Sequence, residues 1–153
     1  MRSLDLSATS LQSNDLTYFL KEISDPQANI TLESLYLSDN QTVNDEVIKS
    51  VCILLKTNTT VKHLYLDKTK VTVHGLRLIL KAIEESRSVE TISIKDCNMS
   101  LMGVVGDEII ELLKNNFSLT NLHIEHNNFD TKFKEGKEAQ LELNKNIIKY
   151  VFT

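Results

Sequence analysis

A nine-residue pattern of apolar and polar positions recurs along the chain. Positions one, four and six of the pattern are apolar, and position nine carries a polar or small residue. Six matches begin at residues 1, 32, 61, 89, 119 and 147, so neighbouring matches are 28 to 31 residues apart. Positions four and six hold Leu4 and Leu6, Leu35 and Leu37, Leu64 and Leu66, Ile92 and Ile94, Leu122 and Ile124, and Tyr150 and Phe152. This alternation predicts a short strand with one buried face in each match.

The segments between the strands carry apolar residues every three or four positions, which is typical of amphipathic helices. The predicted helices span residues 14–24, 45–57, 73–86, 101–115 and 132–143. N-cap side chains are expected at Asn44, Thr72, Ser100 and Asp130. Asn58 and Asn116 follow helices, and we expect each to end its helix in the left-handed conformation.

One strand and one helix cannot bury their own apolar faces, whereas stacked coils can. We therefore expect an α/β solenoid of about five coils, with a parallel sheet on the concave side and the helices outside. Position nine lies in the turn after each strand, where side chains can bond to the backbone of neighbouring coils. The expected ladder is Thr9, Asn40, Thr69, Cys97 and Asn127. Gly75 and Gly103 share position fifteen, which indicates close backbone approach at the first helical turn.

The sixth match, Ile147–Thr153, is rich in β-branched and aromatic residues and predicts a final strand. The alternative is a helix that continues from Lys132 to the end of the sequence and caps the array. If the final strand forms, residues 2–6 and 148–152 are both unpaired sheet edges. Unpaired edges seek partners, so a homodimer through the uncapped ends is one expected assembly.

The repeated pattern resembles leucine-rich repeats, and its usual length resembles the ribonuclease-inhibitor subtype. The resemblance extends over essentially the whole chain and implies a single leucine-rich-repeat domain over residues 1–153. The repeat number and the segment Lys114–Leu119 are also similar to the pointed-end actin-capping tropomodulin type. Ran GTPase-activating proteins share the subtype, but the functional Asn and basic loops of that family cannot be placed here. The fold serves many binding roles, so the resemblance implies protein binding without naming a partner.

Composition excludes several classes of partner. The net charge is −4, from 17 basic and 21 acidic residues, so no strong field attracts nucleic acid or an anionic membrane. No apolar run is long enough for a membrane helix, and residues 1–10 do not resemble a signal peptide. Cys52 and Cys97 are isolated, which suits a reducing compartment. We therefore expect a cytoplasmic protein.

The sequence contains no phosphate-binding glycine loop, catalytic serine motif or paired-cysteine motif, so we expect no enzyme activity, metal or cofactor. His123 and His126 lie on and just past a predicted strand and should point in different directions. Cys97 belongs to the expected ladder, and Cys52 lies within an amphipathic helix. We interpret both cysteines as packing residues.

The residues between the apolar positions of each strand line the concave sheet. Position five holds Asp5, Tyr36, Tyr65, Ser93, His123 and Val151. Because neighbouring strands are about 4.8 Å apart, Tyr36 and Tyr65 should touch. Aromatic residues are common anchors of interfaces. The predicted partner-binding residues are Tyr36, Tyr65, His63, His123, Asp67 and Lys95.

These observations predict a non-enzymatic scaffold that binds an unidentified protein through its concave face. Three alternatives stay open. The chain is a pathogen effector acting on a host protein in the host cytosol, an actin or GTPase regulator, or a fragment of a larger leucine-rich-repeat protein. The fragment hypothesis arises because the first coil lacks a polar cap, which solenoids normally need.

Overall fold

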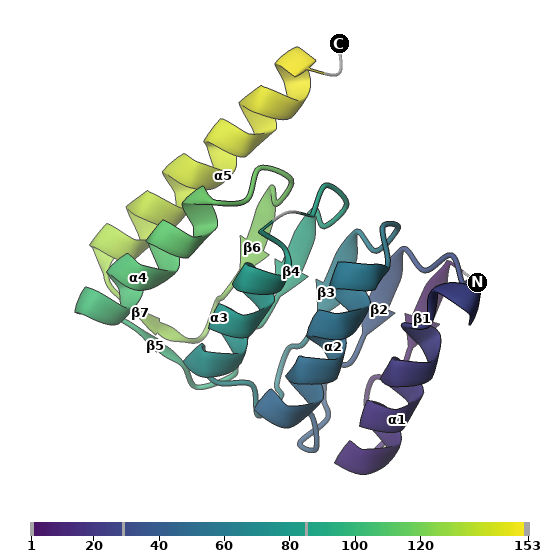
Figure 1. Cartoon of the computed structure of the whole chain (residues 1–153). Helices are drawn as coiled ribbons and strands as arrows, with labels where there is room; N and C mark the ends of the chain where they lie inside the picture. The colour runs from purple at the N-terminus through teal and green to yellow at the C-terminus, as the bar shows by residue number, and fades with distance from the viewer. Residues whose placement is uncertain (1, 29, 85, 152–153) are drawn as a thin grey trace.

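The computed structural model describes residues 2–28, 30–84 and 86–151, in which strands and helices alternate along a solenoid (Figure 1). The inner strands are β1 (Ser3–Asp5), β2 (Ser34–Tyr36), β3 (His63–Tyr65), β4 (Thr91–Ser93) and β6 (Asn121–His123). The helices are α1 (Ser13–Ile23), α2 (Asp45–Thr57), α3 (Val73–Ala82), α4 (Gly103–Lys114) and α5 (Thr131–Val151), with a short 3-10 turn η1 (Pro26–Ala28) after α1. The architecture is the expected α/β leucine-rich-repeat solenoid.

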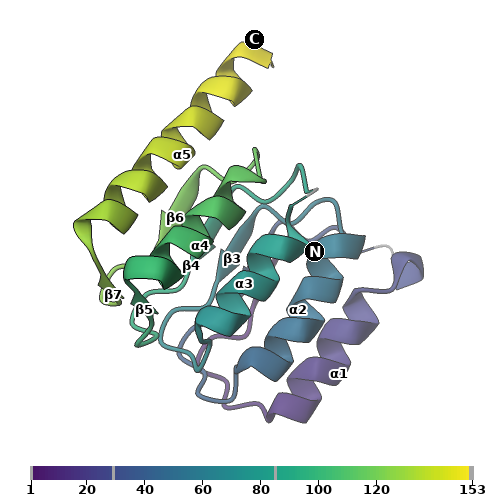
Figure 2. The ribbon, with the colours of Figure 1, turned by 60° about the vertical axis from the view of Figure 1, so that its left-hand side comes forward.

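The inner strands form one parallel sheet in the order β1-β2-β3-β4-β6. The register is the one that the repeat predicts, because Leu4, Leu35, Leu64, Ile92 and Leu122 stand side by side across it. The helices form a layer on the outer side of this sheet (Figure 2). Residues at the same repeat position therefore share a row across the sheet.

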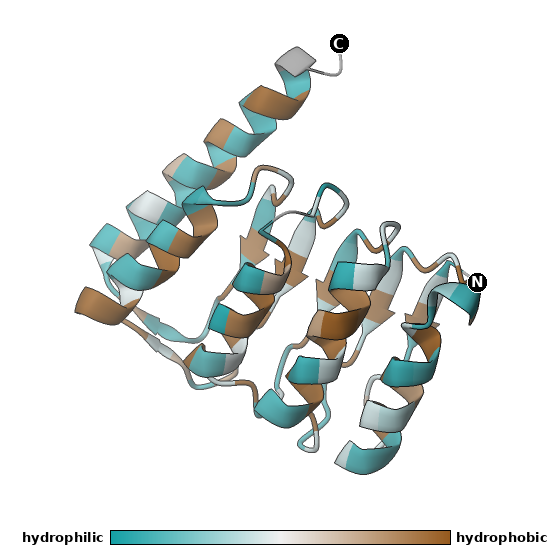
Figure 3. Cartoon of the chain, in the orientation of Figure 1, coloured by the Kyte–Doolittle hydropathy of each residue, from teal (hydrophilic) through white to brown (hydrophobic). Residues whose placement is uncertain are grey.

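The hydrophobic core fills the space between the sheet and the helices. Leu35, Leu64 and Ile92 of the strands and Leu54 and Ile79 of the helices are fully buried there. Figure 3 shows the same division, with apolar segments turned inward on the helices and polar segments outside. Each coil therefore buries its apolar face against its neighbours, as stacked repeats must.

The predicted ladder is present in the turns after the strands. The Asn40 side chain donates to the carbonyl oxygens of Leu6 at 2.8 Å and Leu37 at 3.1 Å. Asn127 makes the corresponding bonds three coils further on. Thr69 donates to the Leu66 carbonyl oxygen, and the Cys97 thiol contacts the same oxygen at 3.3 Å. Thr69 and Cys97 thus bond to the same kind of turn as the asparagines, but with fewer hydrogen bonds.

Three of the four predicted N-caps accept hydrogen bonds from the first turn of their helix, and the prediction for Ser100 is wrong. Asn44 and Thr72 accept bonds from backbone N–H groups at the starts of α2 and α3. Asp130 accepts from Phe133 N in α5 and also from Gly103 N in the preceding coil. Ser100 is not a cap, because α4 begins later, after Met102.

Ser100 instead belongs to a small outer sheet that the sequence did not predict. The strands β5 (Ser100–Leu101) and β7 (Asn128–Phe129) pair in parallel at the turns that lead into the last two helices. Gly103 follows β5 with a φ of 56°, a conformation that glycine adopts without strain. Its role is therefore a turn. Of these two glycines, only Gly75 has a close neighbour: an added Cβ would lie 2.4 Å from a carboxylate oxygen of the Asp45 side chain.

The expectation that Asn58 and Asn116 adopt the left-handed conformation is wrong. Asn58 has an extended backbone, and Asn116 is not among the described residues with positive φ. Their side chains act instead: the Asn116 oxygen accepts from Ser118 N and Leu119 N. The Asn116 amide also donates to the Ile83 carbonyl oxygen of the preceding coil. A second set of asparagine bonds therefore joins the coils at the helix ends.

The predicted final strand is wrong, and the helical alternative holds. Helix α5 runs from Thr131 through Val151, while Phe152 and Thr153 lie outside the described residues. Helix α5 packs against α4 and has contacts with β6. Asn144 is buried and donates to the Asn116 and Leu119 carbonyl oxygens. These tertiary bonds outweigh the strand propensity of the β-branched residues.

No helix within the described ranges has the length and apolar character needed to cross a lipid bilayer.

Candidate functional site

The concave face carries three rows of side chains that cross the sheet. The central row consists of Asp5, Tyr36, Tyr65, Ser93 and His123, one from each strand. A second row consists of Ser3, Ser34, His63, Thr91 and Asn121. A third row, just past the strands, contains Asp67, Lys95 and Glu125. The rows bring together residues that are about one repeat apart in the sequence.

Tyr36 and Tyr65 stack on each other at the centre of this face. Their ring centroids are 4.5 Å apart and their planes differ by 3°. This separation is close to the spacing of paired strands, so the rings stand parallel like neighbouring rungs. Both residues are half-buried. The predicted contact is confirmed, and it holds an aromatic pair in a defined position.

The Tyr65 hydroxyl group stays protonated at neutral pH. Burial raises the pKa of Tyr65 above its usual value, and the adjacent Tyr36 hydroxyl and the Asp67 charge raise it further. The pair therefore offers hydrogen-bonding hydroxyls beside an aromatic surface, which is a common combination at protein interfaces.

Asp67 is fixed next to the tyrosine pair by two hydrogen bonds. Its Oδ1 atom accepts from the Ser93 hydroxyl at 2.6 Å and from Lys95 N at 2.8 Å. Ser93 is 2% exposed, so the first of these bonds is shielded from water. No described cation forms an ion pair with Asp67. The carboxylate is therefore held in position without a neutralising partner.

Lys95 and His123 belong to a separate charged cluster around Glu125. The Lys95 Nζ and His123 Nδ1 atoms each lie 3.7 Å from a Glu125 carboxylate oxygen. Burial acts to raise the pKa of Glu125, but a backbone hydrogen bond and the charges of Lys95, His123 and Lys137 bring it below the usual value. Lys137 comes from α5, so this cluster joins the sheet to the last helix.

The six predicted site residues thus fall into two groups. Tyr36, Tyr65, His63 and Asp67 lie together on and beside β2 and β3. His123 does not adjoin the tyrosine pair, because Ser93 stands between it and Tyr65 in the central row. The sequence also missed Lys137, whose amino group donates to the Leu122 carbonyl oxygen at 3.3 Å. No sequence signal placed α5 beside the sheet.

His63 adds an unpaired polar atom near the tyrosines. Its Nδ1 atom is buried and has no hydrogen-bond partner in the described structure. It stands in the row next to the tyrosine pair, on the same strand as Tyr65. A buried ring nitrogen without a partner is costly unless a further group satisfies it.

The other reactive side chains have structural partners. Burial raises the pKa of the Cys52 thiol to about 11, which keeps it protonated and unreactive at neutral pH. His126 pairs with Asp96, with 3.0 Å between Nδ1 and Oδ1, whereas His123 lies beside Glu125. Within the described part of the chain, no three histidine, cysteine or carboxylate side chains are grouped as metal ligands would be.

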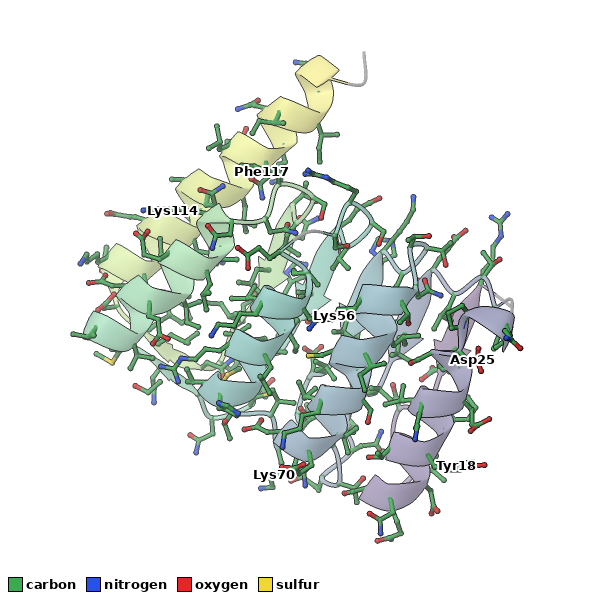
Figure 4. All side chains as sticks on the ribbon, in the orientation of Figure 1. Tyr18, Asp25, Lys56, Lys70, Lys114 and Phe117 are labelled. Carbon is green, nitrogen blue, oxygen red and sulfur yellow. The ribbon has the colours of Figure 1, made fainter. Side chains whose placement is uncertain are left out.

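A second hollowed surface follows the loops that join the helix ends to the next strands; we call it the rim. One rim groove, of about 850 Å³, is lined by Lys56, Lys62, Lys81, Glu84, Arg87 and Glu90 among others. A neighbouring apolar groove, of about 820 Å³, lies between Phe117 and the Ile147 and Ile148 side chains of α5. Figure 4 shows Phe117 beside α5, far from Tyr18 on the outer side of α1.

The comparison with solved structures supports the fold. No family model matches the chain, and no curated protein matches it in sequence. Among solved structures, the leiomodin-1 structure described as actin-binding site 2 has a TM-score of 0.82 and 20% identity, covering 98% of this chain and 84% of that one. The C-terminal domain of tropomodulin from Caenorhabditis elegans has a TM-score of 0.81 and 13% identity, covering 98% and 87%. At these identities the likeness is one of fold: the chain has the leucine-rich-repeat architecture of the tropomodulin and leiomodin structures.

Proposed function

We propose that this chain is a non-enzymatic protein-binding scaffold that contacts its partner through the concave face. The observation that carries the proposal is the stacked pair of Tyr36 and Tyr65 on the exposed side of the sheet. His63 and Asp67 lie beside the pair, and Lys95 and His123 form the polar margin toward β6. A central aromatic anchor surrounded by polar residues is the usual anatomy of a protein interface.

The stacked geometry favours binding because it reduces the cost of ordering side chains. Each ring restricts the other, and Asp67 is already held by the Ser93 hydroxyl and Lys95 N. A partner therefore meets a surface whose rotamers are largely fixed, which lowers the entropy lost on association. Both cysteines are free and buried, which suits the cytoplasmic location that we propose for this scaffold.

A second candidate function is actin binding. The similar leiomodin-1 structure is described as an actin-binding site, and it matches nearly the full length of this chain. The rim offers an alternative surface for such a partner, since Phe117 is 42% exposed there and its groove presents a mainly apolar surface.

The test compares the double variant Tyr36→Ala/Tyr65→Ala with the variant Tyr18→Ala. Tyr18 is 68% exposed on α1, so it controls for loss of an exposed tyrosine outside the concave face. Partners captured by the intact chain are identified by mass spectrometry, purified and titrated against each variant. For an interface hot spot, we expect the double variant to lose about 2–4 kcal/mol of binding free energy. The variant Tyr18→Ala should bind the partner with unchanged affinity. Full binding by a cooperatively folded double variant contradicts the proposal.

Purified actin is titrated in the same way to test the second candidate. The rim variant Phe117→Ser separates the two surfaces. Actin binding that is lost only in the double tyrosine variant makes actin a concave-face partner. Binding that is lost only in Phe117→Ser assigns actin to the rim, and absence of actin binding removes this candidate.

A further inference from the structure

The stacked pair leaves one aromatic face open. Tyr36 and Tyr65 cover each other on their inner faces, because their planes are parallel and one strand spacing apart. The outer face of Tyr36 is therefore turned toward β1, where the residue in the same row is Asp5. The neighbouring positions on β1 and β2 hold only serines: Ser3, Ser7, Ser34 and Ser38. None of these side chains is large enough to cover a tyrosine ring.

Two carboxylates beside this pair have no counter-charge. Asp5 is exposed, and its Oδ1 atom accepts from Ser7 N at 2.9 Å, which lowers the pKa of the carboxyl group. Asp67, on the other side of the pair, is bonded to Ser93 and Lys95 N. Neither carboxylate forms an ion pair within the described ranges.

The cations that directly precede or follow the inner strands β1, β3 and β4 are paired with other carboxylates. The pairs are Arg2 with Glu33, Lys62 with Glu90, Lys68 with Asp39, and Lys95 with Glu125. No cation among the described residues therefore neutralises Asp5 or Asp67, so a positive charge beside the tyrosine pair must come from a partner. An acidic partner would be repelled there, and a purely apolar one would desolvate Asp5 and Asp67 without compensation.

We propose that the concave face receives an arginine side chain of its partner, with the guanidinium group lying on the open face of Tyr36 and its charge against Asp5. This inference rests on the proposed function and names the chemistry of the same site. A guanidinium is planar, stacks on aromatic rings and is attracted to the electron-rich ring face. It also brings donors for the Asp5 carboxylate, so a single side chain meets both features of the site.

The test titrates the isotope-labelled chain with N-acetylarginine amide and follows the resonances of Tyr36, Tyr65 and Asp5 by NMR. N-acetylcitrulline amide is the matched control ligand, because it has nearly the same shape and no charge. We expect saturable shifts with the arginine compound in the millimolar range. Citrulline should bind weaker by roughly an order of magnitude. Equal shifts with both compounds, or none at the tyrosine rings with arginine, overturn the inference.

The variant Asp5→Asn should weaken arginine binding, and Asp15→Asn, an exposed aspartate on α1, should leave it unchanged. Equal affinity in the Asp5→Asn variant also overturns the inference. The outcome is separable from that of the proposed function. If a partner depends on the tyrosine pair but the chain does not prefer the arginine compound over the citrulline compound, the proposed function stands. The inference of an arginine at this site is then rejected.

Discussion

The side-chain amide of Asn40 donates to the carbonyl oxygen of Leu6, which lies 34 residues earlier in the chain, at 2.8 Å. Its oxygen accepts from the N–H groups of Thr9 and Ser10 in that same preceding coil. One buried amide therefore satisfies backbone groups of two neighbouring coils. Asn127 repeats this arrangement between the last two coils.

We predict that Asn40→Ala and Asn127→Ala each lower the free energy of unfolding by about 1–3 kcal/mol. Each substitution leaves several partly buried backbone groups without a partner, and a loss of this size is usual for such groups. Chemical denaturation measures the effect. Asn14→Ala, at an exposed position of α1, is the control and should shift the midpoint very little. Unchanged midpoints for both ladder variants would mean that the amides do not stabilise the coils.

The same reasoning applies to the last helix. Asn144 of α5 is 1% exposed and donates to the Leu119 carbonyl oxygen at 2.7 Å and to the Asn116 carbonyl oxygen at 3.0 Å. We predict that Asn144→Ala loosens α5 and increases amide hydrogen exchange in α5 and β6. Asn146→Ala is the matched control, because Asn146 is exposed on the same helix. Equal exchange in the two variants would show that Asn144 does not hold α5 in place.

The sequence predicts the sheet well and the end of the chain poorly, for physical reasons. The repeat period alone placed Tyr36 beside Tyr65, because a constant spacing fixes the register of stacked strands. Ile147 and Ile148 have strand propensity, but local propensity cannot report that Asn144 bonds to the coil before it. Tertiary bonds of this kind decided that α5 is a helix.

Side-chain partners were also beyond the sequence pattern. The rows placed Lys95 and His123 on the concave face, but in the folded chain both side chains contact Glu125 and not the tyrosine pair. The outer strands β5 and β7 are only two residues long, too short for any periodicity. The pattern therefore predicts which face a residue occupies, and the folded chain determines which neighbour it contacts.

The raised pKa of Cys52 predicts a loss of stability in alkaline solution. The pKa rises from 9.0 to about 11 on burial, so below pH 9 the thiol is protonated in both states. Between pH 9 and 11 the unfolded chain loses this proton and the folded chain keeps it. Folding should therefore weaken by about 2–3 kcal/mol across that window. Urea denaturation of the intact chain and of Cys52→Ala at several pH values checks this. Parallel curves for the two proteins would contradict it.

The two edges of the main sheet should behave differently in association. At β6, Lys137 and Asn144 of α5 donate to backbone carbonyl oxygens, whereas β1 pairs only with β2 in the described structure. We predict that the chain forms a homodimer through β1 at high concentration, because an unpaired edge can extend its sheet. Sedimentation over a range of concentrations should show association that Ser3→Lys reduces. A strict monomer at high concentration would contradict this prediction.

The most direct test of the concave interface is radical footprinting of the tyrosines in the complex with a purified partner. Tyr36, Tyr65 and Tyr18 have the same chemistry, so their oxidation rates compare concave and outer surfaces within one molecule. We predict that the partner protects Tyr36 and Tyr65 severalfold, while Tyr18 is oxidised as fast as in the free chain. Unchanged oxidation of Tyr36 and Tyr65, with protection at Tyr18 or at Phe117 on the rim, would contradict it.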